Sequence, residues 1–321
     1  MKAIRVHTFG APDVLKLEEV PDVFPSAGQV LIRVHAAGVS PLDTYVREQS
    51  HGVPTPALPY IPGFEAAGTI AAVGEGVTQF KTGDRVYTNV FLGAYAEFLV
   101  QDATAVYPLP DNISFAQGAA VSSSYFTAYY ALFNSAKATP GSTVFVHGAS
   151  GAVGIAAVQM ARAAGMTVVG SAGSTEGMQL VKQEGADLVV NHREADYLQK
   201  AIDFTGGKGF DVILEMNATQ KLAEDVNLIA PFSRIIIIGG TNGAVTFDPG
   251  QLLWKGASII GLYIGLASPE ETLEIHRALY RGLADKTLRP QVAQQFTFTD
   301  APLAHETVRT ASSAGKITLA F

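Results

Sequence analysis

The stretch Val144-Phe-Val-His-Gly-Ala-Ser-Gly-Ala-Val-Gly154, continued by Ile155-Ala-Ala-Val-Gln-Met-Ala-Arg162, predicts a buried strand, a tight glycine turn and a helix. Its glycines follow a G-x-x-G-x-x-G spacing, and residues without bulk let the backbone bend sharply and approach a pyrophosphate closely. The helix that follows would direct its unpaired N–H groups and positive dipole end at that anion. The stretch therefore predicts a dinucleotide-binding site.

The glycine spacing carries weight only through its context, because the chain contains 32 glycines and a turn without a ligand can have the same spacing. A strand precedes the turn, an apolar helix follows it, and a second strand begins at Thr167. A dinucleotide fingerprint requires these elements in this order. We therefore favour dinucleotide binding over a glycine-tightened turn without a ligand.

Composition narrows the class of protein. A length of 321 residues indicates two domains, and 48% hydrophobic residues are enough for a substantial core. A net charge of −7 without a cluster of basic residues argues against nucleic acid binding. The longest apolar stretch, 257–267, is too short to span a bilayer, and no N-terminal signal segment is visible. We expect a soluble, cytoplasmic protein that binds neither nucleic acid nor membranes.

The sequence pattern changes near Asn112. Short β-type segments separated by glycine and proline precede it and predict a β-rich, barrel-like domain. A helical segment, 115–136, follows, and then strands alternate with helices, which predicts a doubly wound parallel sheet of the α/β class. The six predicted strands are 143–147, 167–171, 187–190, 211–215, 234–239 and 258–264. The tail from Thr287 returns to strand, helix (303–311) and strand, and we expect it to pack onto the N-terminal domain.

Recognisable motifs run in order from end to end of the chain. They are Ala37-Gly-Val-Ser-Pro-Leu-Asp43 with Tyr45, Pro62-Gly-Phe-Glu-Ala-Ala-Gly68, Gly83-Asp-Arg-Val86, Gly93-Ala-Tyr-Ala-Glu97, Ser124-Tyr-Phe-Thr-Ala-Tyr129, the glycine turn, Asn191-His-Arg-Glu194 and Gly315-Lys316. With these motifs the chain resembles the medium-chain dehydrogenase/reductase superfamily, and within it the zinc-independent quinone oxidoreductases of the ζ-crystallin type. The resemblance implies a GroES-like domain of residues 1–118 plus 287–321 and a Rossmann NADP-binding domain of residues 119–286.

The residues argue against a metal site. The chain contains no cysteine, which excludes disulfides, thiolate metal sites and a cysteine nucleophile. Zinc alcohol dehydrogenases of this superfamily have a cysteine at the position of Ser40 and a histidine at that of Phe64. A hydroxyl is a poor zinc ligand and a phenyl ring is none. Asp43 and Glu65, which resemble positions that serve the metal site in zinc relatives, are expected to be ion-pair or hydrogen-bond partners.

Chemistry without a metal favours some substrates over others. A site without a Lewis acid stabilises an alkoxide poorly, whereas a quinone itself spreads the charge that arrives with a hydride. By resemblance, Tyr45, Ser40 and Thr127 lie near the nicotinamide or the acceptor and are the candidate catalytic residues, because a hydroxyl can bond a developing oxyanion. Tyr45 could instead be an ordinary buried tyrosine, and Tyr125 and Tyr129 are expected to pack in the core.

The end of the second strand indicates the type of cofactor. NAD enzymes usually have Asp or Glu there to bind the adenosine ribose 2′-hydroxyl. Here the strand runs into Ser171-Ala-Gly-Ser-Thr175 with no acid before Glu176, which leaves room for a 2′-phosphate and predicts NADPH. His192 and Arg193 resemble positions at the adenosine end, although a solvated loop is the alternative. The predicted cofactor-binding residues are Tyr45, Thr127, Ser150, Gly151, Ala152, Val153, Gly173, Ser174, His192, Asn217, Ile237, Ile238, Gly239 and Lys316.

The leading hypothesis is an NADPH-dependent quinone oxidoreductase that acts on a small-molecule acceptor. An NADPH-dependent reductase of α,β-unsaturated carbonyls or enoyl thioesters stays open, because the acceptor loops carry no transferable code. A non-catalytic NADPH-binding protein is the third hypothesis. The apolar strand 257–264 is predicted to lie at a sheet edge, which predicts a homodimer through that edge.

Overall fold

The computed structural model describes residues 1–310 and 314–321 and divides them into two compact units. Unit 1 consists of Met1–Ser123, Tyr280–Lys286 and Pro290–Phe321, and unit 2 of Ser124–Leu279 and Thr287–Arg289. Each unit has its own main sheet, so the chain combines two separate architectures.

Unit 2 is built on six parallel strands in the order β10–β9–β8–β11–β12–β13. The strands are β8 (Thr143–Val146), β9 (Thr167–Ala172), β10 (Leu188–Asn191), β11 (Phe210–Glu215), β12 (Ile229–Ile237) and β13 (Ser258–Gly261). The chain starts in the middle of this sheet, builds outward to one edge, and then returns to build the other half. The order reverses between β8 and β11, and ligands of open parallel sheets bind at the carboxyl ends of the strands at such a point.

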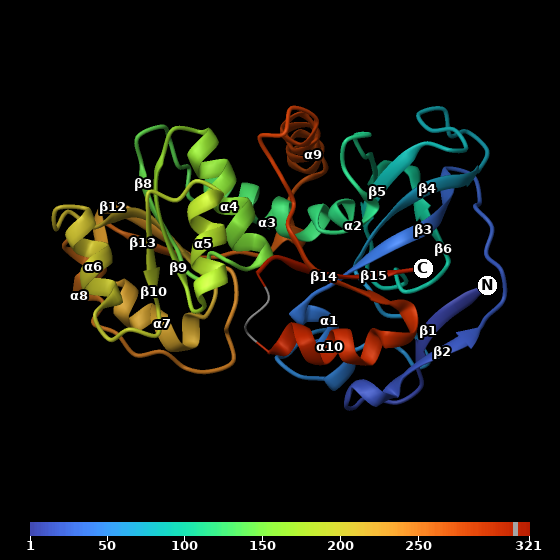
Figure 1. Ribbon diagram of the computed structural model, residues 1–321, viewed down its shortest axis with the longest axis horizontal. Helices are drawn as coiled ribbons and strands as arrows, with labels where there is room; N and C mark the ends of the chain where they lie inside the picture. Colours follow the sequence, from blue (N-terminus) through green and yellow to red (C-terminus); the bar gives the residue numbers. More distant parts are fainter. Residues whose placement is uncertain (311–313) are drawn as a thin grey trace. The chain divides into compact units, whose positions relative to one another are not determined.

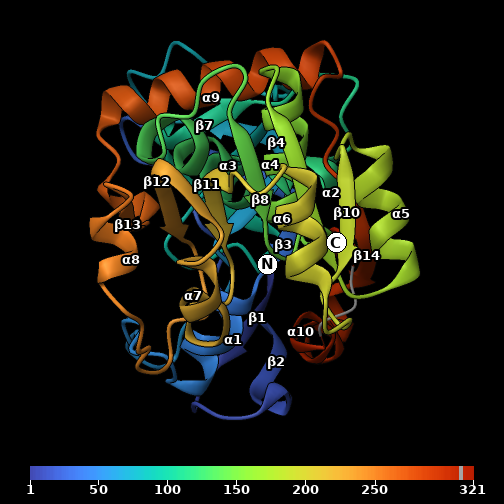
Figure 2. The same ribbon diagram turned by 90° about the vertical axis from the view of Figure 1, so that its left-hand side faces the viewer.

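Helices cover both faces of the parallel sheet, as the alternating pattern predicted. Figure 1 shows α4 and α5 on one face and α6 and α7 on the other, and Figure 2 shows β12, β11 and β8 side by side. The helices of this region are α4 (Ala152–Ala163), α5 (Thr175–Gln183), α6 (Tyr197–Phe204), α7 (Ala218–Asp225), α8 (Gly250–Leu253) and α9 (Pro269–Ala284), with a short 3₁₀ turn at Ile264–Leu266. The central strands β8, β9 and β11 are mostly buried, which explains their runs of apolar residues.

Unit 1 contains a seven-stranded mixed sheet and a two-stranded hairpin. The order β14–β15–β3–β4–β5–β7 is extended by β6, which pairs with β3, and β1 pairs with β2. The elements are β1 (Lys2–Val6), β2 (Leu15–Glu19), β3 (Gln29–Val39), α1 (Pro41–Glu48), β4 (Glu65–Val73), β5 (Arg85–Asn89), β6 (Phe98–Asp102), β7 (Val106–Pro108), α2 (Phe115–Gly118), β14 (Val292–Thr297), α10 (Ala301–Arg309) and β15 (Lys316–Ala320), with 3₁₀ turns at Pro12–Val14, Ala103–Ala105 and Phe298–Asp300.

The C-terminal tail completes the sheet of unit 1. β15 pairs antiparallel with β3, and Ile317 lies opposite Val39. The expectation that the tail packs onto the N-terminal part of the chain is therefore confirmed. Ala311, the last residue of the predicted helix 303–311, lies outside the described residues.

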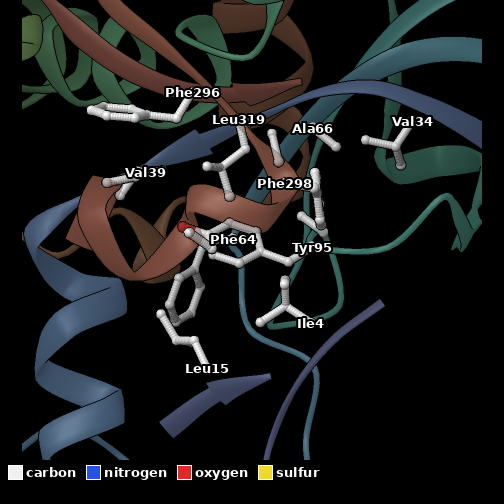
Figure 3. Packing of buried hydrophobic residues seen from close by; sticks show 14 of the residues in the cluster. Ile4, Leu15, Val34, Val39, Phe64, Ala66, Tyr95, Phe296, Phe298 and Leu319 are labelled. Atoms are coloured by element: carbon white, nitrogen blue, oxygen red, sulfur yellow. The ribbon is translucent and has the colours of Figure 1, made fainter. Parts of the chain in front are cut away.

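Aromatic and aliphatic side chains from distant parts of the sequence form the core of unit 1. Figure 3 shows Phe64 and Tyr95 together with Ile4, Leu15 and Leu319, which come from strands and loops far apart in the chain. All five side chains are buried. This core supports the loop and helix that carry Ser40 and Tyr45, because Val39 and Val46 belong to the same cluster.

Three local features differ from the predicted elements. The predicted helix 115–136 is interrupted by π-helical segments at Val121–Tyr125 and Tyr130–Ser135. β12 begins at Ile229 rather than at residue 234, although Phe232 adopts a φ of 61° within it. β13 ends at Gly261 rather than at Ile264, so the apolar run continues beyond the strand.

Candidate active site

The glycine turn joins β8 to α4 in unit 2. Gly148 has a φ of 55°, which favours glycine, and a Cβ on Gly154 would lie 2.5 Å from the Gly148 carbonyl oxygen. The Gly151 N–H donates to the same oxygen at 3.0 Å. The turn is therefore closed by its own backbone and has no space for a side chain at residue 154.

No side chain caps the N-terminus of α4. Gly151 is the N-cap and has no side chain to accept from the first free N–H groups. Ser150, Ala152 and Val153 are half-buried beside it. The structure thus brings together all four predicted residues of the turn, and a pyrophosphate fits the available donors because no side chain competes for them.

The second strand ends in small residues, beside two basic ones. A Cβ on Gly173 would collide with His192 Nε2 and would lie 3.1 Å from Arg193 Nε. Ser174 N-caps α5, and its hydroxyl accepts from the Gly177 N–H at 3.0 Å. Burial lowers the pKa of His192, and the neighbouring Arg193 adds to this shift. At neutral pH the positive charge at this corner therefore comes from Arg193.

The predicted wall of the nicotinamide site is held by main-chain hydrogen bonds. The Glu215 carbonyl accepts from the N–H groups of Ile238 (2.8 Å) and Gly239 (3.3 Å). The Ala218 N–H donates to the Gly239 carbonyl at 3.1 Å, and the Glu215 carboxylate accepts from the Asn217 N–H. Asn217, Ile238 and Gly239 are therefore neighbours just beyond the carboxyl ends of β11 and β12, and Ile237 is the last residue of β12.

Thr127 lies in α3 (Phe126–Tyr129) and is almost fully buried. Its neighbour Tyr125 is 2% exposed and donates from its hydroxyl to Gln159 Oε1 at 2.9 Å. Tyr125 is therefore a core residue, as predicted. Tyr129 packs on the Phe133 ring, with 4.7 Å between the ring centroids.

Ser40 precedes α1 in unit 1 and is tied to Asp43. The Ser40 main-chain N–H and hydroxyl both donate to Asp43 Oδ2, each at 2.8 Å. Because this bond uses the hydroxyl proton, Ser40 Oγ in this conformation can act towards a ligand only as an acceptor. Burial raises the pKa of Asp43 to about 6, while the bonds from Ser40 act in the opposite direction.

Tyr45 is held by stacking rather than by its hydroxyl. Its ring lies 3.8 Å from the His51 ring, and the Arg309 guanidinium lies 5.2 Å from the Tyr45 centroid. None of the hydrogen bonds in the described part of the chain involves the Tyr45 hydroxyl. The half-buried Tyr45 therefore differs from a tyrosine whose hydroxyl is satisfied by backbone.

Lys316 and Glu65 form a buried ion pair in unit 1. The second oxygen of Glu65 accepts from the Ser123 N–H at 3.1 Å and from the Ser122 hydroxyl at 3.3 Å. The expectation that Glu65 and Asp43 serve as ion-pair or hydrogen-bond partners is confirmed. The ammonium of Lys316, predicted to bind the cofactor, is already paired with a carboxylate.

A cavity of about 640 Å³ lies elsewhere in unit 2. Thr143, Thr167 and Asp211, which line it, stand at the amino ends of β8, β9 and β11. The glycine turn lies at the opposite, carboxyl ends of these strands. This cavity is therefore separate from the predicted cofactor site.

Two family models match the chain. "Alcohol dehydrogenase GroES-like domain" matches residues 26–111, and "Zinc-binding dehydrogenase" matches residues 152–279. The quinone oxidoreductase of Sus scrofa is 44% identical over 322 residues, which cover 99% of this chain and 97% of the relative. Quinone oxidoreductase 1 of Escherichia coli is 32% identical and covers 97% of both chains.

A solved structure agrees with these sequence matches. The Escherichia coli quinone oxidoreductase complexed with NADPH has a TM-score of 0.90 and 30% sequence identity, and the match covers 100% of both chains. The chain belongs to the quinone oxidoreductase family of the medium-chain dehydrogenase/reductase superfamily. The predicted resemblance and the predicted fold class are therefore confirmed.

Ser40 and Phe64, the two positions that differ from the zinc enzymes of the superfamily, make other contacts in this chain. Ser40 is bound to Asp43, and Phe64 packs in the core of unit 1, where its ring meets Phe91 edge-on at 5.8 Å. Phe64 offers no ligand atom, and Ser40 offers only a hydroxyl, which is a poor zinc ligand.

Sequence reasoning missed a cluster below the nicotinamide wall. His147, Glu215 and Asp225 are buried, and a ligand atom of each lies within 4.8 Å of those of the other two. His147 Nε2 bonds to Asp225 Oδ1, which is 78 residues away in the sequence. A carboxylate that ends the apolar run Val212-Ile-Leu-Glu215 was the available indication of the cluster.

In the part of the chain that the structure describes, we find no helix long and apolar enough to cross a membrane.

Proposed function

We propose that this chain is an NADPH-dependent quinone oxidoreductase that works without a metal ion. The main support for the proposal is that Gly173 lies against His192 and Arg193 beside the glycine turn. A carboxylate there would repel a 2′-phosphate, whereas a glycine, an N-capping serine and an arginine leave space and supply positive charge. The quinone oxidoreductase names of the relatives support the acceptor class.

In this proposal the glycine turn holds the pyrophosphate. The N–H groups of Ser150, Ala152 and Val153 at the start of α4 would donate to its oxygens. Arg193 would pair with the 2′-phosphate, and Ser174 and His192 would bond it. The Escherichia coli quinone oxidoreductase of the same fold was solved as a complex with NADPH, which supports this assignment.

The remaining predicted residues are proposed to surround the nicotinamide and the acceptor. Asn217 and Ile237–Gly239 would form one wall, and Thr127 would bond the nicotinamide. Ser40 and Tyr45 are proposed to contact the acceptor, and Lys316 to stand near the cofactor through its pair with Glu65. The Tyr45 hydroxyl, which has no hydrogen-bond partner among the described residues, supports a donor role. Ser40 would donate to the acceptor by turning its hydroxyl away from Asp43.

The chemistry follows from these groups. When bound, NADPH would supply two electrons and one proton, and a quinone needs one more proton to become the hydroquinone. The chain would orient the two reactants, exclude water and bond the oxygen on which negative charge develops. A Tyr45→Phe variant tests proton donation by Tyr45, because a donor role predicts that kcat falls by about 10²-fold.

We also propose a homodimer and a cytoplasmic location. β13 lies at one edge of the parallel sheet and has unpaired backbone groups there. Large apolar side chains beside it are exposed, including Trp254 (86%) and Leu266 (77%).

We also propose that the domains comprise residues 1–118 plus 287–321 and residues 119–286. Limited proteolysis is the test of these limits.

A panel of turnover assays tests the proposed activity. Purified protein is assayed with NADPH or NADH against an ortho-quinone, a para-quinone and a 2-alkenal. We expect NADPH oxidation with at least one quinone class. Turnover of the 2-alkenal with inert quinones would identify a double-bond reductase instead, and NADPH binding without any turnover would identify a binding protein.

A further inference from the structure

Three buried titratable side chains lie under the proposed nicotinamide wall. His147 directly follows β8, Glu215 is the last residue of β11, and Asp225 is the last residue of α7. Their exposed fractions are 5%, 0% and 0%. We call these residues the carboxyl–imidazole cluster. β8 and β11 are the two strands between which the strand order reverses, so the cluster lies at the point where the sheet is expected to bind its ligand.

The hydrogen bonds of the cluster are incomplete. His147 Nε2 lies 2.7 Å from Asp225 Oδ1 and 3.4 Å from Glu215 Oε2. Glu215 Oε1 accepts from the Asn217 N–H, but Glu215 Oε2 and Asp225 Oδ2 are buried atoms with no hydrogen-bond partner in the described residues. Two buried oxygen atoms of the cluster therefore lack a donor, and a proton on one of the carboxyl groups supplies one.

Electrostatics leads to the same conclusion. Two buried carboxylates this close cannot both be ionised without a full positive charge beside them. Burial lowers the pKa of His147, so its ring is neutral near pH 7, and burial raises the pKa of Glu215 to about 8. Glu215 is then the protonated member, and Asp225 keeps its charge and accepts from His147.

The cluster is connected to the main chain of the wall. The side chain of Glu215 holds the Asn217 N–H, and the carbonyl of Glu215 holds the N–H groups of Ile238 and Gly239. The backbone of His147 donates to the Leu214 carbonyl at 3.1 Å, one residue before the glycine turn begins. One buried unit thus fixes the ends of β8, β11 and β12 together.

We infer that Glu215 and Asp225 share one proton and, with His147, act as positioning residues that fix Asn217 and Ile238–Gly239 for contact with the nicotinamide. This inference rests on the proposed function, because it assigns a task within the same site. The three residues do not touch the reacting atoms. They act through the loop segments that they hold.

Four variants test the inference. Glu215→Gln keeps an acceptor for Asn217 and a donor for Asp225, so it imitates the protonated acid. Asp225→Asn is its counterpart, because Glu215 can then ionise and keep one charge in the pair. Glu215→Leu removes both bonds at similar volume. Glu224→Gln is the matched control, because Glu224 is a partly exposed acid on the same helix, next to Asp225.

We expect the two amide variants to keep kcat within about threefold of the wild type, since each preserves the bonds of the cluster. We expect Glu215→Leu to lower kcat by about tenfold or more, because the Asn217 N–H loses its buried acceptor. The affinity for adenosine 2′,5′-bisphosphate, which reaches only the adenosine end, should be unchanged. A merely structural role would instead lower stability and leave the kcat of the folded enzyme unchanged.

Infrared spectroscopy tests the shared proton without a destabilising substitution. The wild type at pH 7 should show the C=O stretching band of a buried carboxylic acid, and the band should be absent in Glu215→Gln and present in Glu224→Gln. Absence of the band from the wild type would overturn the inference. A bound metal ion in elemental analysis that is lost in both amide variants would also overturn it.

The outcomes separate this inference from the proposed function. A wild type that does not oxidise NADPH with any quinone contradicts the proposed function. A wild type that does so, with a Glu215→Leu variant whose kcat equals that of Glu224→Gln, contradicts only the positioning role.

Discussion

At the residue scale, the sequence was enough to predict some of the cofactor residues but not the buried residues behind them. The turn residues 150–153 and the corner of Gly173 and Ser174 follow from glycine spacing and from the absence of an acid. The bonds among His147, Glu215 and Asp225 could not be predicted, because the partners are 68 and 78 residues apart in sequence from His147. Contacts of this kind depend on strand order, which local pattern does not reveal.

Arg193 is expected to decide the preference for NADPH. Arg193→Ala should raise KM for NADPH by about 10- to 100-fold, because it removes a charge-assisted bond to the 2′-phosphate, and KM for NADH should change little. Steady-state kinetics with one quinone measures both constants. Lys208→Ala, which removes an exposed cation near the amino ends of the strands, is the control. Equal effects on the two cofactors would contradict this role.

Asp43 is expected to make the stability of the protein depend on pH. Burial raises its pKa from 3.8 to about 6, so the folded protein holds this proton more tightly than the unfolded chain does. Its contribution to the free energy of unfolding is therefore fully present below the unfolded pKa and is lost as the pH rises to about 6, by about 3 kcal/mol.

Urea unfolding of the wild type and of Asp43→Asn between pH 4 and pH 7 measures this contribution. The difference between the two curves should change across that range and be constant above it. Asp13→Asn, which alters a more exposed aspartate of the same unit, should follow the wild type. A constant difference throughout would show that Asp43 does not titrate in this window.

At the scale of elements, the parallel strands and their helices were predicted well because buried strands are continuous apolar runs. α9 was missed, although Ser268 and Glu271 form a capping box that marks its start, with bonds of 2.9 and 3.1 Å. The π-helical segments between residues 121 and 135 could not be predicted, since a period of 3.6 residues describes only regular helix. The prediction extended β13 too far, because exposed apolar residues such as Tyr263 have the composition of a strand.

The glycine turn is expected to tolerate no side chain at residue 154. A Gly154→Ala methyl group would lie 2.5 Å from the Gly148 oxygen and 2.6 Å from the Ala149 Cα, both backbone atoms. We expect the free energy of unfolding to fall by about 1–3 kcal/mol and KM for NADPH to rise at least about tenfold. Gly261→Ala is the control, since no atom lies within 4 Å of a Cβ there. A variant with normal KM would contradict the close approach of cofactor and turn.

At the scale of the whole molecule, composition and motif order were enough to predict two architectures in one chain, because the strand-rich and alternating patterns are distinct. The structure gives each unit its own sheet, and a tail that returns to the first sheet. Self-association is harder to read from sequence, because an apolar residue at an interface has the same identity as one in a core. The exposed apolar side chains beside β13 support the proposed dimer.

Trp254 is expected to stabilise the proposed dimer. Trp254→Glu should shift the protein from dimer to monomer in sizing chromatography with multi-angle light scattering at micromolar concentration, because it places a charge in an apolar interface. Phe24→Glu, which alters a similarly exposed aromatic residue of unit 1, should remain dimeric. A wild type that is already monomeric would contradict the proposed interface.

The central claim is that the glycine turn and the corner beside it serve NADPH in a quinone reductase. The most direct test is the ratio of kcat/KM for NADPH to kcat/KM for NADH, measured on the wild type with one ortho-quinone. We predict a ratio of about ten or more, since a paired 2′-phosphate contributes at least one charge-assisted hydrogen bond. A ratio of one or below, or no oxidation of NADPH by the quinone, would contradict the account.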